Sequence, residues 1–95
     1  MWARVTTLHV DRKRMEEMTR HIDEGIIPAL NGMKGFVGGY WMVDETTGKA
    51  INVALWDTED ALRGSAMPVE VLRDAARNLG AMVNGIETFE VTNHA

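Results

Sequence analysis

The sequence predicts an α+β domain with its strands and helices in the order β-α-β-β-α-β. Residues 2–10 and 86–92 alternate with the two-residue period of a strand, and two further β-prone runs, residues 35–43 and 50–56, flank a segment of turn composition. Apolar residues recur every three or four positions between the first two strands, as in an amphipathic helix. This order is the split β-α-β pattern of ferredoxin-like domains.

The first strand and the helix after it are the most regular part of the pattern. One side of the strand carries Ala3, Val5 and Thr7, and the other carries Trp2, Arg4, Thr6, Leu8 and Val10. Asp11 is suited to cap the helix. The apolar stripe of the helix consists of Met15, Met18, Ile22, Ile26 and Leu30. Gly25 and Pro28 lie late in this helix and predict a bent or irregular last turn, which Asn31 and Gly32 end.

The second and third strands are expected to form an antiparallel hairpin around residues 44–49. If the last residue of one strand pairs with the first residue of the next, Trp41 lies opposite Asn52 and Gly39 opposite Ala54. A slip of one residue would place these side chains on different faces, and the turn length alone does not decide between the two registers.

The second helical region is expected to be broken in two. Asp57, with Asp60 three residues later, suits a helix start, and Pro68 opens a second helical piece. Gly80 is suited to end that piece. Its apolar stripe consists of Val69, Leu72, Ala76 and Leu79. Residues 84–85, Asn-Gly, predict a turn before the last strand.

Length and composition indicate an ordinary globular protein. The chain is expected to form one domain, residues 1–95, with 45% hydrophobic and 25% charged residues. The absence of cysteine excludes a disulfide framework and a thiolate metal site. The first residues lack a signal-peptide pattern, and no stretch approaches the ~18 apolar residues of a membrane helix. We therefore expect a cytoplasmic protein with no membrane partner.

The charge distribution disfavours a nucleic-acid partner. The formal net charge is −4, and the one basic run, residues 12–14, lies beside Glu16 and Glu17 as in a solvated helix start. A clustered basic footprint for phosphates is missing.

Three stretches carry a resemblance to a known family. Residues 27–41 contain IPAL followed by KGFVGGYW, residues 54–62 read ALWDTEDAL, and residues 89–91 read FEV. Over nearly the whole chain this order resembles the antibiotic-biosynthesis-monooxygenase-like family. The resemblance implies a dimeric α+β barrel, in which two protomers stack their sheets. Independently, a sheet covered by helices on one face leaves its other face in need of a partner, so a homodimer is expected.

The resemblance also bounds the chemistry. The superfamily includes cofactor-independent oxygenases, heme-degrading enzymes and proteins without known activity, so the fold alone does not choose a reaction. Heme-degrading relatives carry an Asn on strand one and an iron-ligating His in the second helical region. Here strand one has no Asn and residues 57–83 have no His. We therefore expect no heme and no other cofactor.

The leading site candidates lie on the hairpin. Asn52 interrupts an apolar strand and shares a face with Ala54 and Trp56, since side chains repeat every two residues. In the functional interpretation Trp41 and Trp56 bind a flat aromatic substrate and the Asn52 amide donates a hydrogen bond to a developing oxyanion. In the structural alternative both tryptophans fill the core and Asn52 bonds to backbone or water.

Three further residues are candidates of a weaker kind. His9 ends the first strand, where it could act as a general base at the mouth of a cleft. Tyr40 is a candidate acid or substrate clamp. Arg63, in the helix after the third strand, is a candidate to face an anionic substrate. Their structural alternatives are a surface histidine, a half-buried sheet tyrosine and a solvated arginine. The histidine spacing fits no metal motif.

Two hypotheses follow. The first is a cofactor-independent monooxygenase acting on a phenol-like or quinone-like small molecule. The second is a non-catalytic dimer of the same fold that binds a small ligand or simply assembles.

Overall fold

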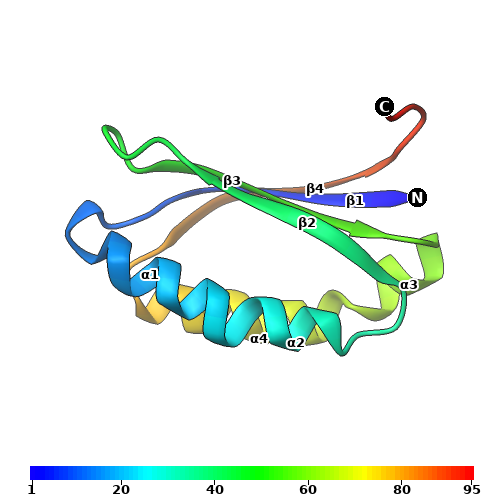
Figure 1. Ribbon diagram of the computed structural model, residues 1–95, viewed down its shortest axis with the longest axis horizontal. Helices are drawn as coiled ribbons and strands as arrows, with labels where there is room; N and C mark the ends of the chain where they lie inside the picture. Colours follow the sequence, from blue (N-terminus) through cyan, green and yellow to red (C-terminus); the bar gives the residue numbers. More distant parts are fainter.

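Four strands form one antiparallel sheet in the computed structural model, which describes residues 1–95 (Figure 1). The strands are β1 (Trp2–His9), β2 (Phe36–Val43), β3 (Lys49–Trp56) and β4 (Met82–Glu90). Their order across the sheet is β2-β3-β1-β4, so β2 and β4 form the edges and the last strand lies beside the first. The predicted α+β class and ferredoxin-like order are confirmed.

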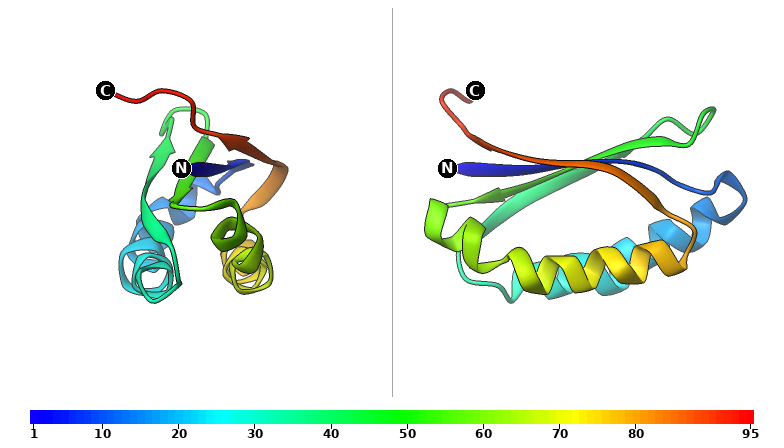
Figure 2. Two further views of the ribbon diagram at one scale, coloured as in Figure 1. Left: turned by 90° about the vertical axis from the view of Figure 1, so that its right-hand side faces the viewer. Right: turned by 180° about the vertical axis from the view of Figure 1, so that it is seen from behind.

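The helices all lie beneath one face of this sheet, as the end-on view of Figure 2 shows. They are η1 (Arg12–Arg14), α1 (Met15–His21), η2 (Ile22–Ile26), α2 (Ile27–Asn31), α3 (Glu59–Gly64) and α4 (Ala66–Asn78). None of them is both long enough and apolar enough to cross a membrane. The second helical region is broken as predicted, because α3 ends at Gly64 and α4 begins two residues later.

The first helical region contains the irregularity that its sequence predicts. The segment η2 is a π-helical turn that includes Gly25, and Pro28 follows in the first turn of α2. Proline has no N–H to donate to the carbonyl four residues earlier, and its ring crowds that carbonyl, so the preceding turn widens instead of continuing as an α-helix.

Two local predictions are wrong in detail. The side chain of Thr58, not that of Asp57, caps α3 by accepting a hydrogen bond from the backbone N–H of Ala61 at 3.1 Å. Asn84 and Gly85 form no turn, because β4 already begins at Met82 and the ladder with β1 shifts its register at this point. The turn lies at Gly80 instead, whose φ of 92° requires glycine.

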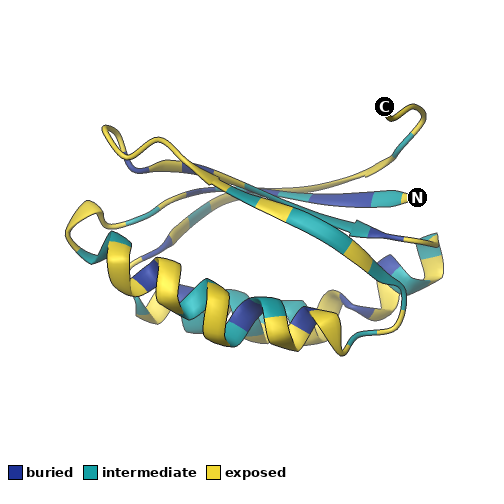
Figure 3. Ribbon diagram, viewed as in Figure 1, coloured by how far each residue is buried: buried dark blue, intermediate teal, exposed yellow.

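The core lies between the sheet and the helices (Figure 3). Leu8, Ala50 and Met18 belong to one apolar cluster, and Trp56, Ile26 and others belong to a second. The side chains of even-numbered residues on β1 and β3 therefore face the helices. The opposite face carries the apolar residues Val5, Tyr40, Met42, Ile51, Val53, Leu55 and Phe89, and no helix covers it.

Candidate functional site

The hairpin adopts the register that brings the predicted polar and aromatic residues together. Trp41 pairs with Asn52, and Gly39 pairs with Ala54. On its other side Asn52 pairs with Thr6 of β1. Asn52 therefore lies in the middle of the helix-facing side of the sheet, with an indole on one side and a hydroxyl on the other.

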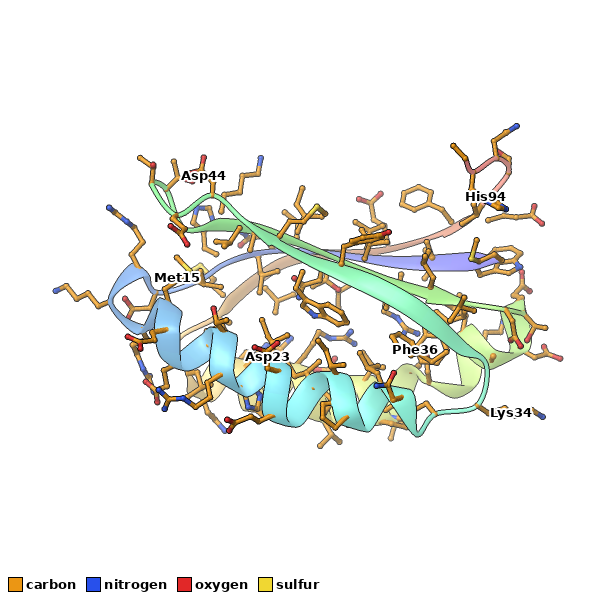
Figure 4. All side chains as sticks on the ribbon, in the orientation of Figure 1. Met15, Asp23, Lys34, Phe36, Asp44 and His94 are labelled. Carbon is orange, nitrogen blue, oxygen red and sulfur yellow. The ribbon has the colours of Figure 1, made fainter.

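A cavity of about 260 Å³ lies between this face of the sheet and the first helical region. Its polar side chains include the Asn52 amide from the sheet and Asp23 from the helices, and most of its remaining walls are apolar. Met15 and Asp23, both labelled in Figure 4, belong to its helical wall. The cavity exceeds the ~150 Å³ that accommodates benzene in an engineered apolar site, so it has room for an aromatic ring.

The Asn52 amide is available to a ligand. It takes part in none of the side-chain hydrogen bonds of the fold. It is also not one of the side-chain polar atoms that are fully buried without a hydrogen-bond partner. An amide open to an apolar cavity can donate to a ligand oxygen without first breaking a protein hydrogen bond.

A second, smaller compartment of about 70 Å³ adjoins the first. Five residues line both compartments: Leu8, Ile26, Trp41, Asn52 and Ala76. Asn52 is the polar residue among them. The smaller compartment extends toward α4 and is lined by Arg4, Thr6 and Arg73 as well as apolar residues. The apolar cavity therefore leads to a polar end.

Trp56 occupies the core and does not line either compartment. It is 0% exposed, its ring meets Phe36 edge-on at 5.3 Å between centroids, and the Arg4 guanidinium lies 5.9 Å from its ring. Trp56 therefore packs against Arg4 as a core residue. The prediction that its ring contacts a substrate is not met, because it lines neither compartment.

His9, Tyr40 and Arg63 also lie away from the cavity. Tyr40 is 66% exposed on the uncovered face of the sheet, because its neighbour Trp41 faces the helices. Arg63 is exposed on α3 and pairs with Glu59. His9 is exposed at the end of β1, where its Nδ1 lies 3.3 Å from the Asn84 amide.

Three residues near the ligand space carry charge that sequence patterns did not single out. Asp23 is the one titratable residue lining the larger cavity. Arg4 and Arg73 line the smaller compartment. Burial, followed by the nearby Arg73 charge, lowers the pKa of Arg4 below its ordinary value. One sequence feature could have predicted the position of Arg4: the alternation along β1 places it on the same face as Leu8, which packs in the core. No group of three or more acidic or histidine residues is placed to hold a metal ion.

Sequence comparison finds relatives of greater length. No family model matches the chain. The uncharacterized proteins Rv2557 and Rv2558 of Mycobacterium tuberculosis are 28% and 29% identical over 91 residues, which is 96% of this chain. The chain spans about two fifths of the length of these relatives, 41% and 39% respectively.

Comparison with solved structures identifies the fold. The monooxygenase ActVA-Orf6 of Streptomyces coelicolor, in complex with nanaomycin D, superposes with a TM-score of 0.71 at 19% identity, covering 99% of this chain and 88% of that one. SnoaB of Streptomyces nogalater, a cofactor-independent oxygenase, gives 0.72 at 15%, covering 98% and 94%. The heme-degrader MhuD of Mycobacterium tuberculosis gives 0.72 at 15%, covering 100% and 99%. The sequence resemblance is thus confirmed at the level of the fold.

Proposed function

Since the chain has the fold of the antibiotic biosynthesis monooxygenases, we propose that it is a cofactor-independent monooxygenase acting on a phenol-like or quinol-like aromatic molecule. The observation that carries this proposal is the mostly apolar cavity of about 260 Å³ whose lining includes the unbonded Asn52 amide and, paired with it across the hairpin, the Trp41 indole. A flat aromatic ring stacks on an indole, and an amide N–H stabilises an oxyanion.

The chemistry requires little from the protein. Removing a proton from an electron-rich phenol or anthrone-type substrate leaves a delocalised anion. Part of its charge lies on the oxygen attached to the ring, where an amide N–H can donate a hydrogen bond to it. Transfer of electrons from this anion to O2 forms a C–O bond and a hydroperoxide. Loss of water then leaves a new carbonyl, so one oxygen atom enters the product and the other leaves as water. The substrate supplies the electrons.

The proton acceptor in this scheme is Asp23 at the cavity wall, because its carboxylate is the titratable side chain there and it is open to solvent. This assignment replaces His9, which lies outside the cavity. An apolar enclosure around the reacting carbon limits side reactions with water.

We also propose a homodimer formed through the uncovered face of the sheet. Tyr40, Phe89 and Met42 are exposed there beside other apolar residues. Contiguous apolar surface of this kind is uncommon on monomers, and burial contributes about 25 cal/mol per Å² removed from water. Closing this face by a second copy matches the dimeric barrel that the resemblance implies.

Oxygen consumption tests the catalytic proposal. Incubating the protein with anthrone or a naphthalenediol in an oxygen electrode should give uptake that scales with protein concentration. Asn52→Ala should lower the rate by about 10²-fold, the cost of one oxyanion donor. Asn84→Ala is the matched control, since this asparagine is exposed on β4 and lies outside the cavity.

The second candidate is a non-catalytic dimer that binds a small aromatic ligand. A specific observation favours it: Asp23 has no acid–base partner among the residues that line the larger cavity. Ligand binding without oxygen uptake across the substrate panel would select this function over the enzyme.

A further inference from the structure

The smaller compartment contains a buried cation that has no anionic partner in the protein. Arg4 is only 6% exposed. Its Nη1 donates to Ser65 Oγ and its Nη2 to the Leu62 carbonyl, both at 2.8 Å, and no carboxylate forms an ion pair with it. Burying a charge without a counter-ion raises the free energy of the folded protein, so the presence of Arg4 at this position calls for an explanation.

A second arginine reaches the same compartment from α4. The Arg73 side chain is 14% exposed, and its Nε and Nη2 both bind Oε2 of Glu70, at 2.8 and 2.6 Å. Its Nη1 is buried and has no hydrogen-bond partner. Nearly all buried polar atoms are paired, so an unpaired guanidinium N–H beside a cavity marks a place for an acceptor that the protein itself does not supply.

The charges around this compartment all have the same sign. Arg4 and Arg73 line it, and no acidic residue does. Its volume of about 70 Å³ exceeds the ~15 Å³ that one water needs, which leaves room for a group the size of a carboxylate. The neighbouring larger cavity is mostly apolar and shares five lining residues with it, Trp41 and Asn52 among them.

We propose that Arg4 and Arg73 form a subsite for the carboxylate of an aromatic acid, whose ring lies in the larger cavity beside Trp41. This inference rests on the proposed ligand-binding function and narrows it to an anionic substrate class. Arginine N–H groups bind carboxylates through charge-assisted hydrogen bonds. The Asn52 amide then lies between the carboxylate and the ring, where a ring oxygen can reach it.

Binding of a matched pair of probes tests the subsite. Naphthoate and its neutral amide, naphthamide, differ only in the charged group, and isothermal titration calorimetry measures both. We expect naphthoate to bind at least about tenfold tighter than naphthamide, and Arg73→Gln to abolish that preference. Arg77→Gln is the control, because Arg77 also pairs with Glu70 but does not line the compartment.

The outcomes separate the two proposals. Equal affinity for the two probes, or a preference that Arg73→Gln leaves intact, would overturn the subsite while the aromatic cavity stands. Failure of both probes to bind would overturn both proposals. Arg4→Lys provides an independent variant, since it keeps the charge but not the two-pronged contact to Ser65 and Leu62; circular dichroism checks that it folds, and a reduced naphthoate preference supports the subsite.

Discussion

The indole of Trp41 lies against Gly39, two residues before it on β2. A Cβ built at Gly39 would come within 3.3 Å of Cη2 of Trp41 and would also collide with the Val53 carbonyl oxygen. The Trp41 indole, which lines the cavity, can therefore occupy this position because residue 39 has no side chain.

Substitution of Gly39 tests this packing. Gly39→Ala should lower the free energy of unfolding by about 1–3 kcal/mol in urea titrations, because the backbone of β3 cannot move away without breaking the ladder. Gly64→Ala is the control, since a Cβ at Gly64 meets nothing within 4 Å. A Gly39 variant as stable as the control would show that the sheet relaxes at this point.

The role of Asp23 is tested by its isosteric amide. Asp23→Asn should lower kcat about 10²-fold or more and leave substrate affinity nearly unchanged, because the change removes a proton acceptor but keeps the shape of the wall. Glu24→Gln, on the next residue and outside the cavity, should behave as wild type. Loss of affinity without loss of kcat would make Asp23 a wall residue only.

Charge on the uncovered sheet face tests the dimer. Tyr40→Glu should convert a dimer to a monomer in light scattering at micromolar concentration, because it places a carboxylate in an apolar contact. Val71→Glu is the control, since Val71 is equally exposed but lies on α4, away from the sheet. A wild-type monomer, or a Tyr40→Glu dimer, would contradict this interface.

Acid should weaken the ion pairs of α4. Hydrogen bonds from Arg77, and secondarily from Arg73, lower the pKa of Glu70 below its ordinary value of 4.5. Its contribution to stability is therefore complete above about pH 4.5 and is lost as the pH falls through the lower folded-state pKa. Urea unfolding across this range should show a shallower acid decline for Glu70→Gln than for wild type. Identical slopes would mean that the pairs contribute nothing measurable, as is common for exposed pairs.

The sequence predicted the fold where its local patterns were unambiguous. The two-residue period of β1 and the turn composition before β3 predicted the strand order and the hairpin, and Gly25 with Pro28 located the irregular helical turn. The hairpin register was left open between two alternatives, and the structure shows the one that pairs Trp41 with Asn52. The start of β4 was misplaced because Asn84 and Gly85 have turn composition. In the structure Gly85 pairs with Thr7 and Val83 pairs with Leu8, so only Asn84 is left out of the ladder at the register shift.

The site was predicted only in part. The alternation along a strand shows which face of the sheet a side chain lies on, but not whether that side chain is buried in the core or lines a cavity. Trp41 and Asn52 reach the cavity as their register required. Trp56 shares their face but lies at the end of β3, where α3 and Phe36 enclose it. Arg4 and Arg73 were missed because an arginine in a single sequence indicates a solvent-exposed position. Only the packing of the second helical region against the sheet buries them, and Arg4 binds Leu62 of α3 and Ser65.

The central claim is that an aromatic ligand binds in the cavity beside Asn52 and Trp41. The most direct test is a proton–nitrogen correlation NMR spectrum of the labelled protein, titrated with naphthalenediol. We expect the side-chain amide signals of Asn52 and the indole N–H signal of Trp41 to shift together and saturably, while the Asn84 amide stays in place. Unshifted Asn52 and Trp41 signals at saturating naphthalenediol, or equal shifts at Asn84, would contradict it.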